Sequence, residues 1–184
     1  GGYSSALVTF NNSLWVFGRN DEGQLGQDTV RNQSLPIQVL RGQSDSGDNY
    51  ISLVSQVSVG YNHMAAIRTI ENEGGVALQE VYAWGDNAYG QLGIGTADST
   101  DRRVPTRVKL DENTNLGEAG SSVGTLERLA AGRYFTLGLT TDQRVVASGR
   151  NDEGQLGIGV ASDDKVVYPT PGGGRRDRPA QHRP

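Results

Sequence analysis

The chain has 184 residues, a hydrophobic fraction of 35%, no cysteine and 26 glycines, about twice the usual share of glycine. This composition favours a turn-rich β protein and excludes disulfide bonds, thiolate metal sites and cysteine nucleophiles. The net charge is −4, but residues 1–171 alone carry 13 basic and 20 acidic side chains, which disfavours nucleic-acid binding and favours a basic protein partner.

The first unit predicts a hairpin and then a glycine-rich turn. Residues 3–10 alternate in polarity and residues 14–17 are β-formers, with a polar turn between them. Residues 18–26 read G-R-N-D-E-G-Q-L-G and predict a long turn. A further strand is expected at 35–40, with Pro36 near an edge or a strand start. A hydrophilic loop follows.

The second and third units repeat this order. In the second unit we predict strands at 51–59, 64–67, 81–84 and 104–108, with a long polar connection at 69–80. In the third unit we predict strands at 126–131, 135–140, 144–147 and 166–169. Residues 172–184 lack periodicity and are basic, so we predict a disordered tail.

The glycine-rich turn is the clearest internal repeat. Residues 149–157 repeat 18–26 residue for residue, and residues 85–93 share the pattern G-x-N-x-x-G-Q-L-G. The three copies begin at residues 18, 85 and 149, and self-similarity at such a regular spacing indicates a repeat architecture. The chain is therefore divided into units at approximately 1–50, 51–124 and 125–171, each predicted to form four short antiparallel strands, as in a propeller blade.

Two sets of residues carry a resemblance to a known family. The first is a G-x-x-x turn followed by small residues, as in residues 60–66, and the second is W-G-D-N-x-x-G-Q-L-G at residues 84–93. Together they resemble the repeat of the regulator of chromosome condensation (RCC1) family. The resemblance implies an all-β fold made of β-propeller blades, about three blades of a ring that generally has seven. Because three blades cannot close such a ring, we expect either a longer parent chain, which is favoured, or self-association.

The repeated motif is interpreted as scaffolding. It lacks the Lys and Ser/Thr of a phosphate-binding loop and the alternating acidic spacing of a calcium loop. We expect its glycines to permit tight turns and its leucines to fill the space between blades. These structural residues are Gly18, Gly23, Leu25, Gly26, Gly85, Gly90, Leu92, Gly93, Gly149, Gly154, Leu156 and Gly157.

No catalytic, cofactor-binding or metal-binding constellation is expected. His63 is the only histidine outside the tail and has no cysteine beside it, so it is interpreted as a packing residue. No serine lies in a nucleophile-elbow or triad context. No targeting signal is visible, and the compartment stays open, with the cytoplasm or nucleus favoured.

The insertions between strands are the candidate partner surfaces, because loops on a rigid scaffold carry function. Three of them are acidic, although long hydrophilic loops are also tolerated at little cost. Their candidate partner-binding residues are Asp45, Asp48, Glu71, Glu73, Asp111 and Glu112.

Three functions are weighed from these observations. The first is a non-enzymatic protein-interaction module within a larger propeller. The second, implied by the resemblance alone, is guanine nucleotide exchange on a small Ran-like GTPase. The third, also implied by a relative of this architecture, is inhibition of an enzyme by a secreted propeller.

Overall fold

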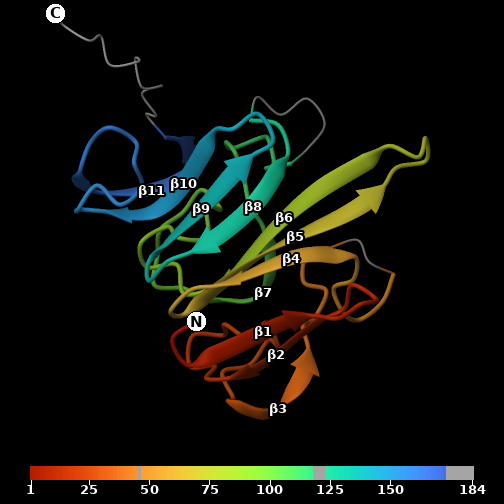
Figure 1. Cartoon of the computed structure of the whole chain (residues 1–184). Coiled ribbons are helices and arrows are strands. Elements are labelled where there is room, and N and C mark those ends of the chain that lie inside the picture. Colours follow the sequence, from red (N-terminus) through yellow and green to blue (C-terminus); the bar gives the residue numbers. More distant parts are fainter. Residues whose placement is uncertain (45–46, 118–122, 173–184) are drawn as a thin grey trace, which may run out of the picture.

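Eleven β-strands and no helix make up the part of the chain that the structure describes, residues 1–44, 47–117 and 123–172. The structure is a computed structural model, in which three antiparallel sheets follow one another along the chain (Figure 1). The strands are β1 (Ser4–Val8), β2 (Leu14–Gly18), β3 (Gln33–Gln38), β4 (Val54–Val59), β5 (His63–Glu71), β6 (Ala77–Gly85), β7 (Arg102–Arg107), β8 (Leu126–Ala131), β9 (Phe135–Thr140), β10 (Val145–Asn151) and β11 (Ser162–Pro171).

Each sheet pairs consecutive strands. The first sheet has the order β1-β2-β3, the second β4-β5-β6-β7, and the third β8-β9-β10-β11. In all three sheets, the first glycine of the repeated motif pairs with the start of the preceding hairpin strand, as in Ser4↔Gly18, His63↔Gly85 and Phe135↔Gly149. This shared register confirms the sequence alignment of the three units and the all-β blade architecture.

The first unit forms the three strands predicted for it in chain order and lacks, in its described part, the fourth strand of the general blade pattern. Its described part forms three strands, because β1 corresponds in register to β5 and β9, the second strands of the other sheets. The second correction concerns residues 69–80, which were expected to be a loop. Backbone pairing continues from Thr69↔Gln79 to Glu71↔Ala77, so most of that segment extends the hairpin of β5 and β6.

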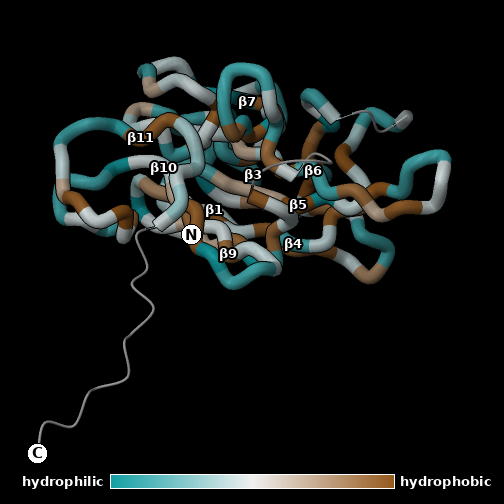
Figure 2. The backbone as a smooth tube through the Cα atoms, turned by 90° about the horizontal axis from the view of Figure 1, so that it is seen from above, coloured by the Kyte–Doolittle hydropathy of each residue, from teal (hydrophilic) through white to brown (hydrophobic). Residues whose placement is uncertain are grey.

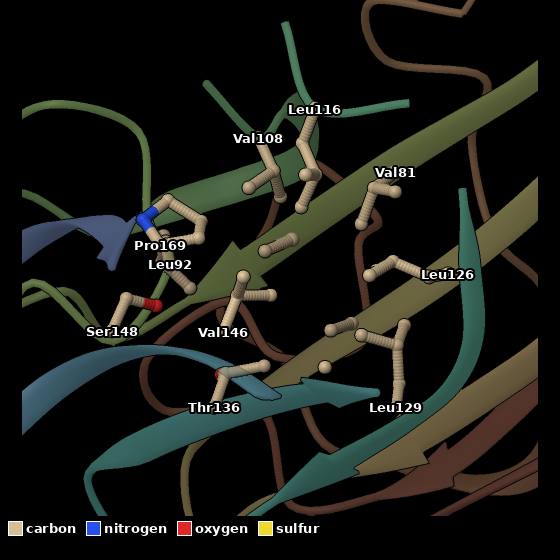
Figure 3. A pocket seen from close by; sticks show the side chains of 13 residues that line it. Val81, Leu92, Val108, Leu116, Leu126, Leu129, Thr136, Val146, Ser148 and Pro169 are labelled. Carbon is tan, nitrogen blue, oxygen red and sulfur yellow. The ribbon is translucent and has the colours of Figure 1, made fainter. Parts of the chain in front are cut away.

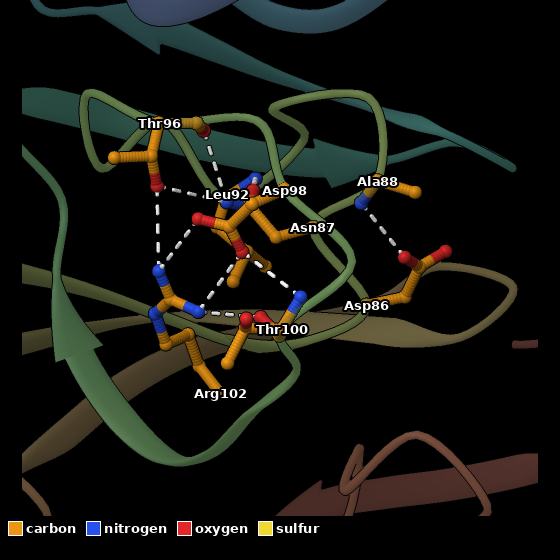
Figure 4. Close-up of polar contacts among 8 residues, drawn as sticks. All are labelled: Asp86, Asn87, Ala88, Leu92, Thr96, Asp98, Thr100 and Arg102. Carbon is orange, nitrogen blue, oxygen red and sulfur yellow. Dashed lines mark hydrogen bonds and ion pairs between the residues drawn. The ribbon is translucent and has the colours of Figure 1, made fainter.

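The repeated motif is a turn closed by its asparagine. The side chain of Asn87 accepts a hydrogen bond from the backbone of Leu92 at 3.2 Å and donates to the carbonyl of Thr96 at 2.9 Å (Figure 4). Asn20 and Asn151 hold Leu25 and Leu156 in the same way. All three leucines are buried. Each copy of the motif thus forms an asparagine-closed turn with a buried leucine, and its role as scaffolding stays a prediction.

The first motif glycine is required by its backbone. Gly18, Gly85 and Gly149 have φ angles of 108°, 98° and 114°. A Cβ atom at each position would lie 2.4 Å from the carbonyl oxygen of the residue just before the paired strand. Only glycine fits both conditions without strain.

The core lies in two seams between sheets. The first seam joins the first and second sheets, and the second seam joins the second and third. Because side chains alternate along a strand, β5 sends Met64 and Ala66 to the first seam and Ala65 and Ile67 to the second. Hydrophilic residues are concentrated in the outlying loops (Figure 2). The second sheet is thus buried on both faces, and it fixes the positions of the loops at its two ends.

The two seams are filled differently. In the first seam, Trp84 is fully buried and its indole Nε1 donates to the backbone carbonyl of Gln24 at 2.8 Å. At the equivalent place in the second seam, Ser148 lies 3.5 Å from the carbonyl of Gln91. A cavity of about 20 Å³, lined mainly by aliphatic side chains, remains beside Ser148 (Figure 3). The smaller side chain leaves this space unfilled.

Candidate functional site

The three acidic insertions emerge at the same end of the second sheet. Strand β5 ends here, and β4, which is antiparallel to β5, begins here. Strand β6 begins here, and β7, which is antiparallel to β6, ends here. This end, which we call the loop end, therefore carries the described parts of the three insertions, residues 41–44 and 47–53, residues 72–76, and residues 108–117 and 123–125. The predicted residues Asp48, Glu71, Glu73, Asp111 and Glu112 are all exposed on it. Asp45 and residues 173–184 of the predicted tail lie outside the described residues.

The β5–β6 hairpin projects from the loop end (Figure 1). Its turn is closed by Asn72, whose side-chain oxygen accepts from the backbone N–H groups of Gly74 and Val76 at 3.0 and 2.9 Å. Glu71 and Glu73 flank Asn72, and Val76 is 58% exposed. The hairpin therefore presents two carboxylates and one apolar side chain on an ordered turn.

A buried ion cluster supports the body of this hairpin. Glu80 accepts from Arg68 at 2.6 Å and from the Tyr82 hydroxyl at 2.9 Å, and it lies 2.5 Å from Arg107 of β7. Burial opposes ionisation of Glu80, but the hydrogen bonds from Arg68 and Tyr82 and the charge of Arg107 outweigh it, so the pKa of Glu80 is lowered. The ionised cluster ties β5, β6 and β7 together beneath the loop end.

The other two insertions are also anchored. Gln43 donates its backbone N–H to the carbonyl of Pro105, and its side-chain oxygen accepts from the backbone of Arg107, both at 2.9 Å. In the third insertion, hydrogen bonds from the backbone of Asn113 and from Thr114 lower the pKa of Asp111. Asp111 is thus occupied in shaping its own loop, whereas Asp48 and Glu112 make no ion pair with a described residue.

The opposite end of the molecule carries a feature that the sequence analysis missed. Here the guanidinium of Arg133 lies 5.0 Å from the ring centroids of both Tyr61 and Tyr134. Tyr134 is 4.8 Å from Tyr89, and Tyr61 is 6.0 Å from Tyr3. We call these five residues the tyrosine–arginine stack. It crosses both seams at their exposed edge, and cation–π contacts of this kind stabilise modestly at exposed sites.

A sequence signal for the stack exists. Tyr3, Tyr61 and Arg133 each follow the glycine of a G-x-x-x turn, at Gly2, Gly60 and Gly132. The shared position would have placed them on one end of the molecule. Their contacts could not be foreseen, because the stack alternates between residues of different units and depends on how the sheets pack.

The histidine and carboxylate side chains of the described residues are dispersed. None of their His, Asp and Glu side chains forms a group of three or more that could hold a metal ion. His63 is fully buried in the second seam, with Nε2 2.9 Å from the hydroxyl of Thr136. That hydroxyl donates to the carbonyl of Gln91 at 2.7 Å, so Nε2 carries the proton that Thr136 accepts. In the described part of the chain, no helix is long and apolar enough to cross a membrane.

Comparison with known proteins identifies the repeat. Residues 11–67 and 80–139 match the family model of the Regulator of chromosome condensation (RCC1) repeat, and residues 54–91 and 127–155 match a second model of that repeat. This chain belongs to the RCC1 repeat family. The resemblance found in its sequence motifs is thereby confirmed, and its three sheets are RCC1 blades.

Several curated proteins contain similar RCC1 repeats. The Ultraviolet-B receptor UVR8 of Arabidopsis thaliana is 28% identical over 85% of this chain and 29% of its own length. The X-linked retinitis pigmentosa GTPase regulator of Homo sapiens is 32% identical over a match that covers 84% of this chain and 12% of the regulator. Protein RCC2 homolog of Xenopus laevis is 30% identical over a match that covers 89% of this chain and 26% of its own length. The chain thus spans less than a third of each of these relatives.

Solved structures show the same fold. Human WBSCR16 superposes with a TM-score of 0.66 at 24% identity, covering 93% of this chain and 36% of that one. Prp20p from Saccharomyces cerevisiae superposes with a TM-score of 0.64 at 19% identity, covering 93% of this chain and 36% of that one. The structure of Prp20p was described together with its binding properties to Gsp1p and histones. At these identities the likeness shows only the fold, the β-propeller of the RCC1 family.

Proposed function

We propose that this chain is a non-enzymatic protein-interaction module that binds a basic protein segment through its loop end. The observation that carries the proposal is the projecting β5–β6 hairpin, whose exposed Glu71 and Glu73 form no ion pair with a described residue. Carboxylates held on an ordered turn are available to a partner without rearrangement, which lowers the entropic cost of binding.

Charge and placement support this reading. Residues 1–171 carry more acidic than basic side chains, and Asp48 and Glu112 add exposed carboxylates at the same end. Val76 supplies an apolar contact beside the hairpin carboxylates. An RCC1 scaffold presents such loops rigidly, because the buried cluster at Glu80 fixes the hairpin to the second sheet.

The test compares two double variants that remove equal charge from opposite ends. A fluorescent peptide of alternating lysine and serine is titrated with the full chain, and binding is followed by anisotropy at low and at physiological salt. We expect E71Q/E73Q to weaken binding by about two- to thirtyfold, since each of the two exposed ion pairs lost contributes ~0.2–1 kcal/mol. The control D163N/D164N, on β11, should change it little. Equal effects of the two variants would contradict the proposal.

A second candidate is regulation of a small GTPase. It is favoured by the similarity to the X-linked retinitis pigmentosa GTPase regulator. The test measures release of a fluorescent guanine nucleotide from a panel of Ran-like GTPases in the presence of the intact protein. Acceleration of release from any member would support exchange, and unchanged rates across the panel would remove this candidate.

A further inference from the structure

A tight turn of the first sheet, residues 9–12, is bonded to the start of the second sheet at the loop end. The carbonyl of Asn12 accepts a hydrogen bond from the backbone of Val54, the first residue of β4, at 3.0 Å. The carbonyl of Leu53 accepts one from the backbone of Thr69 in β5, also at 3.0 Å. We call residues 9–12 together with Leu53 and Val54 the loop-end junction. Because the junction lies between two described sheets, its exposure does not come from an open outer face.

Leu53 is strained and exposed at once. Its φ angle is 58°, in the left-handed region that bulky residues rarely adopt. Its side chain is 45% exposed and lies outside both hydrophobic clusters that fill the seams. Asparagine would adopt this backbone more readily, because its short polar side chain can hydrogen-bond to the local backbone. The fold thus bears the backbone strain without burying the leucine.

Phe10 is a second large apolar side chain at the junction. It lies in the turn and is 106% exposed, so its ring is not shielded from water by any part of the fold. Such a turn favours Gly, Asn, Asp or Ser and does not need an aromatic residue. Tyr50 and Val76, which are 42% and 58% exposed, lie at the same end. Exposed apolar side chains gathered in one region mark an interaction site.

The charges around the junction indicate which kind of segment it fits. Asp48, Glu71 and Glu73 are exposed at the loop end and form no ion pair with a described residue. Apolar side chains with carboxylates around them complement a segment that carries both apolar and positively charged side chains. A basic segment without apolar side chains would leave Phe10 and Leu53 in contact with water.

We propose that the loop-end junction is a docking site for the apolar side chains of an amphipathic basic protein segment. The inference rests on the proposed function and extends it. The carboxylates attract the lysines or arginines of the segment, and its apolar side chains cover Phe10 and Leu53. Burial of apolar surface adds affinity that salt does not screen, whereas salt weakens the exposed ion pairs.

The test compares two peptides of equal charge. One is the alternating lysine–serine peptide, and the other has two of its serines replaced by leucine. Binding of each peptide to the full chain is measured by fluorescence anisotropy at physiological salt. We expect the leucine peptide to bind at least about tenfold more tightly, because it buries apolar surface in addition to forming ion pairs.

The two proposals fail in different ways. Equal affinities of the two peptides, with E71Q/E73Q still weakening both, would overturn the docking site and leave the proposed function standing. If E71Q/E73Q bound both peptides as tightly as the unmodified chain, the proposed function itself would be overturned, and the docking site with it.

Three variants locate the apolar contact. Leu53→Asn and Phe10→Ser should each reduce the preference for the leucine peptide to about threefold or less, because each removes apolar surface from the junction. Leu35→Asn is the matched control, since Leu35 is 73% exposed in the middle of β3, away from the loop end. The control should keep the full preference. An equal loss in the control would show unspecific apolar binding and overturn the proposal.

Stability separates a docking role from a structural one. Because asparagine tolerates the left-handed backbone better than leucine, Leu53→Asn should not lower the urea concentration at the midpoint of unfolding. Phe10→Ser should not lower it either, since the ring is fully exposed. Lowered midpoints in both variants would show that these side chains serve the fold and would overturn the proposal.

Discussion

His63 joins the second and third sheets through an uncharged hydrogen bond. It is fully buried and bonds Thr136, and burial lowers its pKa from 6.5 to about 4. Because the folded pKa lies below the unfolded value, the neutral ring stabilises the fold above about pH 6.5, and this contribution is lost as the pH falls toward 4. The histidine expected to be a packing residue therefore also makes the second seam sensitive to acid.

Substitution of His63 should reduce this acid sensitivity. We expect the unmodified chain to lose on the order of 2–3 kcal/mol more unfolding free energy than His63→Gln between pH 7 and pH 4, since glutamine does not titrate. Urea unfolding followed by tryptophan fluorescence at both pH values measures the difference. Parallel losses in the two proteins would show that carboxylates alone account for the acid sensitivity.

Arg133 provides a second residue-scale test, because it contacts rings from two sheets. Arg133→Ala should lower the unfolding free energy by about 1 kcal/mol through loss of two cation–π contacts. Arg128→Ala is the matched control, since its side chain is 74% exposed and its nearest carboxylate is 3.9 Å away. The control should stay within ~0.5 kcal/mol of the unmodified chain. A similar loss in both variants would assign the stack no stabilising role.

At the scale of elements, the two seams differ in what joins them. The first uses a buried indole, and the second uses two hydroxyls beside a small cavity. The strands carrying these side chains are equivalent in register, so the difference comes from side-chain identity alone. The first seam is therefore more dependent on a single residue.

This difference predicts unequal costs of truncation. Trp84→Phe should lower the unfolding free energy by about 1–3 kcal/mol, because it leaves the buried carbonyl of Gln24 without its donor. Ser148→Ala should cost less than ~1 kcal/mol, since its 3.5 Å contact is long and Thr136 still bonds Gln91. Differential scanning calorimetry of the two variants tests the order, which would be wrong if Ser148→Ala were the more destabilised.

For the whole molecule, the second sheet is the stable centre of a linear array. Each blade contacts only its neighbours, so a sheet packed on both faces is held by two interfaces. Strands β5 and β6 are buried in both seams, whereas the third sheet packs on only one described neighbour. The loop end and the tyrosine–arginine stack thus lie at opposite ends of the sheet that is buried on both faces.

Native-state hydrogen exchange should reveal this gradient. We expect backbone amides in the middle of β5 and β6 to exchange about tenfold more slowly than those of β9 and β10, because opening the second sheet disrupts both seams. The outer strands β3 and β11 should exchange fastest. Mass spectrometry of peptic fragments after timed exchange resolves these segments. Uniform protection across the three sheets would indicate cooperative unfolding and contradict the array description.

The sequence alone determined the repeat, most strands and the family, because those signals are local. A positive φ at Gly85, the asparagine that closes each motif and the polarity of successive residues are all encoded within a few positions. The acidic character of the predicted partner residues was likewise readable, and the exposure of five of them is now evident. Their role in binding remains a prediction.

Only the tertiary structure decided how the units meet. Residues 69–80 are polar, yet cross-strand pairing satisfies their backbone groups and extends the hairpin, which outweighs their weak strand preference. The tyrosine–arginine stack and the cavity beside Ser148 both depend on contacts between units far apart in sequence. Local patterns specify each blade, but the free energy that positions neighbouring blades comes from surfaces that exist only once the chain has folded.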